Sequence, residues 1–87
     1  MKILITGYAG FIGFHLVNKL IKNKNNYVVG IDNFNNYYDV NLKKNRNKIL
    51  NKQSIKNFKG IKVDLNNIKK ISYLFKKYKF DYVVHLA

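Results

Sequence analysis

The sequence predicts an α/β fold, a doubly wound parallel sheet of four strands in the order 3-2-1-4 with helices on both faces. Short β-branched runs alternate with segments whose apolar residues recur at helical spacing, and no repeat or linker separates them. A chain of 87 residues has room for one small domain at most. Hydrophobic residues make up 47% of it, which is too many for a disordered chain despite the net charge of +13.

The first half of the chain predicts a strand, a glycine turn, a helix and a second strand. Residues 2–6 are a short apolar run followed by Gly7, which is typical of a buried parallel strand. The helix begins at Phe11 and fades at residues 23–26. Its inward positions are expected to be Phe11, Ile12, His15, Leu16, Lys19 and Leu20. Residues 27–31 are a second β-branched run closed by Asp32, so the segment has the length of one βαβ unit, about thirty residues.

The second half repeats the alternation. Asp39 is the expected N-cap of a helix that ends by Ser54, with Val40, Leu42, Lys43, Arg46, Ile49 and Leu50 on its inner face. Residues 58–63 predict the third strand, although Gly60 weakens it. Asn66 or Asn67 caps a third helix with a stripe of Ile68, Ile71, Leu74, Phe75 and Tyr78, and residues 81–86 predict the fourth strand. The chain stops at Ala87, where such a sheet builds its ligand crevice, so we expect residues 1–87 to be the amino-terminal part of a larger domain, without a substrate domain.

The net positive charge is consistent with a nucleic-acid or anionic-membrane partner. However, Lys, Asn, Ile, Tyr and Phe, the residues favoured by A/T-rich codons, account for 53 of the 87 positions, and the basic residues are scattered. We therefore expect a solvated basic surface and no nucleic-acid partner. No stretch reaches the roughly 18 apolar residues of a membrane helix, and glycines interrupt the apolar amino terminus, unlike a signal peptide. We expect a soluble cytoplasmic protein without a membrane partner.

Three glycines, Gly7, Gly10 and Gly13, lie between the first predicted strand and the first predicted helix. Each has a mechanical reason in a phosphate-binding turn. The first allows a tight turn, the second lets the backbone approach a pyrophosphate, and the third lets the helix pack closely on the strand. The helix amino terminus then offers amide groups and a positive dipole end to the phosphates. The spacing therefore predicts a dinucleotide site, with a purely structural glycine turn as the alternative.

Asp32 strengthens the dinucleotide prediction. It ends the second strand 19 residues after Gly13, close to the spacing at which an acid accepts hydrogen bonds from the adenosine ribose. A carboxylate there repels a 2′-phosphate, and no arginine follows within the next thirteen positions, so NAD is favoured over NADP. An aspartate that only caps a turn is the alternative.

With these motifs in place, the sequence resembles the cofactor half of the extended short-chain dehydrogenase/reductase superfamily, and within it the nucleotide-sugar epimerases. The resemblance covers all 87 residues, and the matching stretches are residues 5–7, 10–13, 32–33, 63–65 and 80–87. Residues 30–43, Gly-Ile-Asp-Asn-Phe-Asn-Asn-Tyr-Tyr-Asp-Val-Asn-Leu-Lys, are similar to UDP-glucuronate 4-epimerases. The resemblance implies a Rossmann-type fold that binds NAD, and a homodimeric full-length parent that epimerises a UDP-sugar at C4 by reversible hydride transfer.

The resemblance also implies roles for individual residues. Backbone at the pyrophosphate comes from Phe11 and Ile12, the adenosine ribose is held by Asp32 and Asn33, and Asn35 and Asn36 line the phosphate side. The adenine is bordered by Asp64 and Leu65, with Asp64 accepting from the exocyclic amine, and Leu86 and Ala87 begin the wall nearest the nicotinamide ribose. Tyr8 departs from the small residue common at its position, which reduces the expected clearance over the pyrophosphate.

Catalysis in the superfamily is assigned to a Ser or Thr and a Tyr-x-x-x-Lys pair on a later helix, which lies beyond Ala87. Tyr73 and Lys77 have that spacing but precede the fourth strand, so we expect Tyr73 to be partly buried and Lys77 to be solvated. His15 is expected to pack in the first helix and His85 to be buried and hydrogen-bonded. Because that catalytic pair lies beyond Ala87, the chain alone is expected to be inactive. No cluster of residues has metal-ligand spacing.

Three alternatives remain open at this stage. The chain could be the NAD-binding part of a nucleotide-sugar dehydratase or reductase that shares this cofactor half. It could be a non-catalytic remnant that binds NAD weakly or not at all. It could also be a basic interaction module, whose affinity for nucleic acid would fall steeply with salt.

Overall fold

Four parallel strands form one sheet in the order β3-β2-β1-β4, which confirms the predicted topology. The computed structural model describes residues 1–34, 40–53 and 56–87. Its elements are β1 (Lys2–Thr6), α1 (Phe11–Leu20), β2 (Tyr27–Asp32), α2 (Val40–Gln53), β3 (Phe58–Lys62), α3 (Ile68–Tyr78) and β4 (Tyr82–His85). The predicted element boundaries differ from these by one or two residues. Asp39, the expected cap of α2, lies outside the described residues.

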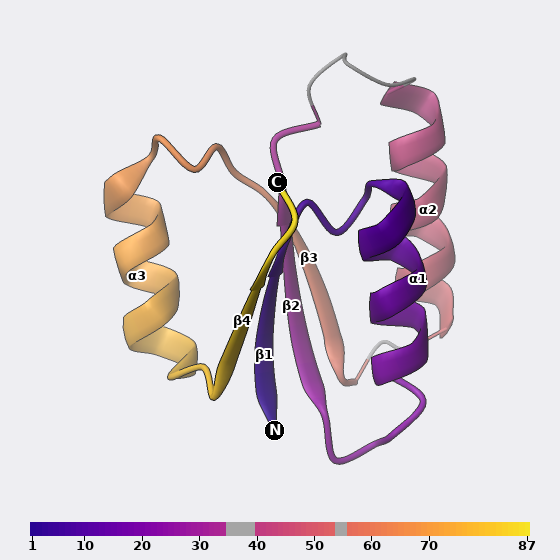
Figure 1. Cartoon of the computed structure of the whole chain (residues 1–87), viewed down its shortest axis with the longest axis horizontal. Coiled ribbons are helices and arrows are strands. Elements are labelled where there is room, and N and C mark those ends of the chain that lie inside the picture. Colours follow the sequence, from indigo (N-terminus) through magenta and orange to yellow (C-terminus); the bar gives the residue numbers. More distant parts are fainter. Residues whose placement is uncertain (35–39, 54–55) are drawn as a thin grey trace.

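The helices cover both faces of the sheet, as expected for a doubly wound fold. Figure 1 shows α1 and α2 on one side of the strands and α3 on the other. β1 lies between β2 and β4, so that Leu4 is in register with Val29 on one side and Val83 on the other. Because the strands are parallel, their carboxyl ends and the glycine turn lie at the same end of the sheet as Ala87 (Figure 1).

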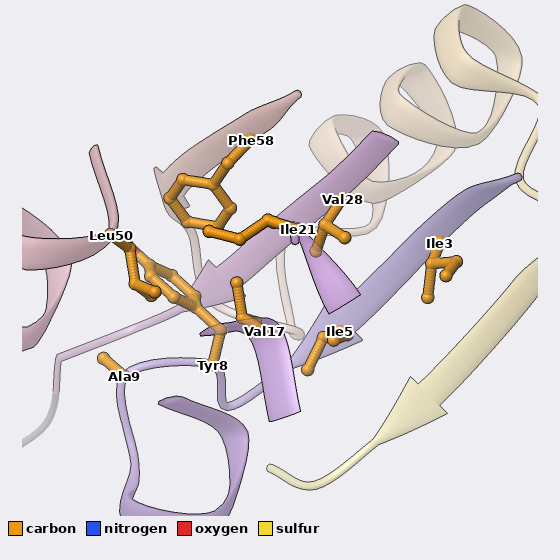
Figure 2. Packing of buried hydrophobic residues seen from close by; sticks show 9 residues of the cluster. All are labelled: Ile3, Ile5, Tyr8, Ala9, Val17, Ile21, Val28, Leu50 and Phe58. Carbon is orange, nitrogen blue, oxygen red and sulfur yellow. The ribbon is translucent and has the colours of Figure 1, made fainter. Parts of the chain in front are cut away.

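Each face of the sheet has its own hydrophobic cluster, because successive side chains of a strand point to opposite faces. The cluster beneath α1 and α2 contains Ile3, Ile5, Tyr8, Ala9, Val17, Ile21, Val28, Leu50 and Phe58 (Figure 2). The cluster beneath α3 contains Leu4, Val29, Ile31, Val63 and Leu74. The central strand β1 contributes to both clusters, which explains its unbroken apolar sequence.

The predicted inner face of α1 is wrong for Phe11, Ile12 and Lys19, whereas Leu16 and Leu20 are half-buried against the core as predicted. Its buried residues are Gly13 and Val17, whereas Phe11 and Ile12 are each 67% exposed. A Cβ at position 13 would lie 2.4 Å from the Gly7 carbonyl oxygen, so only a glycine allows the helix to approach the turn this closely. That contact sets the rotation of the helix and directs Phe11 and Ile12 outward.

Three further expectations about burial need correction. His15 is exposed, and its ring packs edge-on against Phe11 and Phe14 on the helix surface. Tyr73 is 57% exposed because it lies on the outer side of α3, while Lys77 is exposed as expected. His85 is also exposed, since β4 is an edge strand among the described residues, although its expected hydrogen bond is present.

The inner faces of α2 and α3 are narrower than predicted. On α2, Lys43 and Leu50 are buried, whereas Leu42 and Ile49 are exposed. The α3 stripe has Leu74 buried, Ile71 and Tyr78 half-buried, and Ile68 and Phe75 exposed. Asn67 is the N-cap of α3, and its side chain accepts a hydrogen bond from the Lys70 amide at 3.2 Å. Within the described ranges, no helix has both the length and the apolar character needed to span a membrane.

Candidate functional site

A cavity of about 400 Å³ lies at the carboxyl ends of the four strands. Doubly wound sheets bind ligands at this position. Eight of the residues predicted from the sequence line the cavity: Gly7, Gly10, Asp32, Asn33, Asp64, Leu65, Leu86 and Ala87. Phe11, Ile12 and Gly13 begin α1 beside it without lining it, and Asn35 and Asn36 lie outside the described residues. The structure thus brings together side chains from four separate segments of the sequence.

Five residues that line the cavity were not predicted as site residues from the sequence: Thr6, Ile31, Lys43, Val63 and Asn66. Thr6, Ile31 and Val63 lie at the ends of β1, β2 and β3, and the rule that ligands bind beyond strand ends could have identified them. Asn66 follows the predicted adenine residues by one position. Lys43 carries no such signal, because it reaches the cavity from the second turn of α2.

The glycine turn has the geometry of a phosphate-binding turn. Gly7 has φ +74°, a conformation that L side chains rarely adopt, and its amide donates to the Ile31 carbonyl oxygen at 2.8 Å. A Cβ added at Gly10 would meet, among the described residues, only the Gly7 carbonyl oxygen, at 3.3 Å. Gly10 therefore keeps the surface of the turn flat toward the cavity. The expected crowding by Tyr8 is wrong, because its side chain is 1% exposed and lies in the core (Figure 2).

The amino terminus of α1 supplies hydrogen-bond donors beside the turn. Gly10 is the N-cap, and the first helical hydrogen bond runs from the Phe14 amide to the Gly10 carbonyl oxygen at 2.9 Å. The amides of Phe11, Ile12 and Gly13 precede that bond and have no acceptor within the helix. Together with the helix dipole, they are suited to an anionic group such as a phosphate.

Asp32 is a buried carboxylate that accepts hydrogen bonds from three parts of the chain. Its Oδ2 accepts from the Ala9 amide at 3.3 Å, and its Oδ1 accepts from the Phe34 amide at 2.7 Å. Lys43 Nζ lies 3.2 Å from the same Oδ1 and forms an ion pair in which both side chains are less than one-tenth exposed. A carboxylate has about four acceptor sites, so Asp32 retains capacity for a ligand hydroxyl. Lys43 is thus a cation beside the acid that the absence of a nearby arginine did not predict.

Three residues on one side of α2 contact the glycine turn and the end of β2. Lys43 pairs with Asp32, Arg46 Nη1 donates to the Ala9 carbonyl oxygen at 3.0 Å, and Asn47 Oδ1 accepts from the Tyr8 hydroxyl at 2.7 Å. Positions three and four apart lie on the same face of a helix. The glycine turn and the acid at the end of β2 are therefore held by the same helix face.

The last residues of the chain close the cavity against Gly7. Thr6 Oγ1 accepts from the amides of Leu86 at 3.0 Å and Ala87 at 3.3 Å. The Thr6 hydroxyl is also hydrogen-bonded to His85 Nδ1, at 2.7 Å. A Cβ at Gly7 would lie 3.0 Å from the Ala87 nitrogen, so this wall can approach only a glycine.

The residues after β3 form the remaining wall. Asp64 Oδ1 accepts from the Asn66 amide at 2.8 Å, which orders the turn before α3, and Leu65 is 40% exposed. An apolar side chain beside a carboxylate suits a flat ring that carries an amine. Among the described residues, no group of His, Cys, Asp or Glu could hold a metal ion.

Comparison with known proteins decides the family. A family model described as GDP-mannose 4,6 dehydratase matches residues 4–87. The chain belongs to this family. It is 49% identical over 87 residues to protein CapI of Staphylococcus aureus, covering 100% of this chain and 25% of that protein. It is 41% identical over 87 residues to UDP-glucuronate 4-epimerase 4 of Arabidopsis thaliana, covering 100% of this chain and 19% of that protein.

A solved structure gives the same result. The UDP-glucuronic acid 4-epimerase from Bacillus cereus, in complex with UDP-glucuronic acid and NAD, matches with a TM-score of 0.87 at 41% identity. The match covers 100% of this chain and 26% of that one. The expected resemblance to nucleotide-sugar epimerases is confirmed, and the chain spans only about a fifth to a quarter of the length of the relatives that it matches.

Proposed function

We propose that this chain binds NAD in the cavity at the carboxyl ends of its strands, as the cofactor-holding portion of a nucleotide-sugar 4-epimerase that acts on UDP-glucuronate. The observation that carries the proposal is the position of Asp32, at the carboxyl end of β2 and hydrogen-bonded to the Ala9 amide of the glycine turn. An acid held there accepts from ribose hydroxyls, while the turn and the start of α1 receive the phosphates.

The residues present fit the cofactor. Gly10 leaves the cavity side of the turn without a side chain, and the first amides of α1 are suited to the pyrophosphate. Asp64 and Leu65 border the adenine, and Leu86 and Ala87 begin the wall beside the nicotinamide ribose. When bound, NAD supplies hydride acceptance and return. The described residues position and shield the dinucleotide.

The choice of NAD over NADP depends on the Asp32–Lys43 ion pair. While Asp32 is present, it neutralises Lys43 and gives the ribose an acceptor at a place where a 2′-phosphate would meet a second anion. Lys43 is the cation that would hold a 2′-phosphate if Asp32 were removed. The substrate assignment rests on the relatives, whose names specify UDP-glucuronate or UDP-glucuronic acid 4-epimerase.

A second candidate is a nucleotide-sugar dehydratase with the same cofactor portion. The description of the matching family model, GDP-mannose 4,6 dehydratase, favours it. Both candidates require the NAD site, so the site can be tested before the sugar is known.

The test is calorimetric titration of the chain with NAD. We expect saturable binding that Asp32→Ala weakens and Lys77→Ala leaves unchanged, since Lys77 is exposed on α3 and does not line the cavity. Absence of binding at millimolar NAD by a folded chain would contradict the proposal.

A further inference from the structure

The side chain of Tyr8 lies across two glycines that face each other in neighbouring strands. Gly30 of β2 and Gly60 of β3 are register partners. A Cβ at Gly30 would lie 2.4 Å from Tyr8 Cγ, and a Cβ at Gly60 would lie 2.5 Å from the Tyr8 hydroxyl. The tyrosine therefore extends from one strand to the next, a separation of about 4.8 Å. Any other residue at either glycine would occupy its place.

The space over Gly30 and Gly60 that holds the Tyr8 ring is called the seat below, and aromatic side chains and Asn47 border it on its other sides. Phe58 packs on the Tyr8 ring with centroids 5.6 Å apart, and Phe34 packs edge-on at 6.2 Å. The hydroxyl donates to Asn47 Oδ1 at 2.7 Å. With one hydrogen-bond partner and aromatic contacts, the ring has a single orientation in the core. Burial, and to a lesser extent the charge of Asp32, raise the pKa of Tyr8, which keeps the hydroxyl a neutral donor.

Hydrogen bonds hold the backbone of the turn at Gly7 and Ala9, the residues before and after Tyr8. The Gly7 amide donates to the Ile31 carbonyl oxygen, and the Ala9 carbonyl oxygen accepts from Arg46. Ala9 is also the residue whose amide reaches Asp32, at 3.3 Å. A shift of the Tyr8 ring would therefore be transmitted to Ala9 and then to the contact with the acid.

We infer that Tyr8 is a positioning residue, whose ring, seated on Gly30 and Gly60 and tethered by Asn47, sets the height of the glycine turn over the end of β2. Gly60 is then explained as the space for the hydroxyl end of Tyr8, although a glycine weakens a strand. The consequence for NAD affinity rests on the proposed function, whereas the geometry of the turn does not.

A positioning role and simple core filling make different predictions. In Tyr8→Ala the seat is empty, and a valine at position 60 would point into it from β3. Gly60→Val alone should destabilise the chain, because its Cβ would meet both the Tyr8 hydroxyl and Asn47 Oδ1. In the Tyr8→Ala background the same substitution should raise the melting temperature. If Tyr8 only fills the core, the double variant should regain both the stability and the original conformation of the glycine turn. If Tyr8 positions the turn, the double variant should regain the stability alone.

The experiment measures melting temperature, NMR amide shifts of Gly7, Ala9 and Gly10, and NAD affinity for the 87-residue chain and its variants. We expect Tyr8→Ala/Gly60→Val to be more stable than Tyr8→Ala. Its turn amide shifts should still differ from those of the unmodified chain, and its NAD binding should be weaker by about tenfold, the scale of one lost contact. Turn amides that return to their original shifts would overturn the inference.

Tyr8→Phe gives a second reading should the alanine variants fail to fold. It keeps the ring and removes only the bond to Asn47. We expect displaced Gly7 and Ala9 amides and weaker NAD binding, and Tyr73→Phe, at an exposed tyrosine of α3, is the matched control. Unchanged turn amides in Tyr8→Phe would contradict the tether. An unmodified chain that binds no NAD would refute the proposed function and leave the amide readings of Tyr8 interpretable.

Discussion

Lys43 Nζ lies 3.2 Å from Oδ1 of Asp32, in an ion pair between the first turns of α2 and the end of β2. Both side chains are buried, so removing either one would leave an uncompensated charge in the interior and destabilise the fold. This relationship makes the pair, and not the acid alone, the determinant of the charge that a ligand meets at the edge of the cavity.

Removing the acid should change the cofactor preference. In Asp32→Ala the ammonium of Lys43 no longer faces this carboxylate beside the ribose position, so we expect NAD affinity to fall and NADP to bind at least as well as NAD. A change of about tenfold in the ratio corresponds to about 1.4 kcal/mol. Calorimetry with both cofactors measures it.

The control for that change is Asp32→Ala/Lys43→Ala, which lacks both charges. NADP affinity should drop again in this variant. If the unmodified chain bound the two cofactors equally, Asp32 would not be the discriminating residue.

Two of the glycines should respond differently to substitution. Gly10→Val should leave the fold largely intact, because among the described residues its Cβ would meet only the Gly7 carbonyl oxygen, at 3.3 Å, and should abolish NAD binding by filling the place of the pyrophosphate. Gly13→Val should instead unfold much of the chain, at a cost of about 3 kcal/mol or more, since its Cβ would lie 2.8 Å from Tyr8 Cα. Circular dichroism and NAD titration separate the two effects. Full NAD affinity in folded Gly10→Val would indicate a purely structural turn.

Stability should decrease at alkaline pH because of Tyr8. Burial raises its pKa in the folded state, so the unfolded chain ionises first once the pH exceeds the ordinary tyrosine value of about 10. Its contribution to stability is complete below that pH and is lost above it, by up to about 1.4 kcal/mol per pH unit. Urea unfolding at pH 8 and above pH 10 measures the loss.

Tyr8→Phe should show a smaller alkaline loss than the unmodified chain. Tyr27, whose pKa partial burial also raises, is present in both proteins. The difference between the two pH profiles therefore isolates Tyr8. Identical profiles would show that this hydroxyl ionises as easily in the folded chain as in the unfolded one.

The chain alone should not interconvert UDP-glucuronate and its C4 epimer. The only tyrosine and lysine with the expected catalytic spacing in the described ranges, Tyr73 and Lys77, lie on α3 and do not line the cavity. A coupled assay with NAD should give no rate above background. Measurable turnover would show that other groups of the chain supply the acid and base.

β4 should make the isolated chain associate. Among the described strands it pairs only with β1, and Tyr82 and Val83 are 61% and 49% exposed. A free apolar edge invites pairing with another chain. The net charge of +13 should slow this at low salt and less so at 0.1 M, where screening acts over about 10 Å. Light scattering against salt measures the association.

Val83→Lys should reduce that association, whereas Asn45→Lys adds the same charge on the exposed surface of α2 and should have less effect. Equal effects of the two variants would mean that net charge, and not the β4 edge, controls association.

The sequence by itself determined the order of elements, the parallel sheet and most of the cavity lining. These depend on local signals: β-branched runs, helical spacing, and the turn residues Gly7 and Asp32 at the ends of strands. Strand ends in such a sheet converge, so residues far apart in the chain could be assigned to one site before any contact was known.

Only the tertiary structure decided what depends on the rotation of a helix or on the meeting of distant side chains. The apolar pattern of α1 predicted Phe11 and Ile12 on its inner face, but the contact of Gly13 with the turn directs them outward. Tyr8 was expected to crowd the phosphate side, but the paired glycines at positions 30 and 60 receive its ring in the core. Lys43 carried no local sign of its partner, because an ion pair across eleven residues depends on how α2 packs against β2.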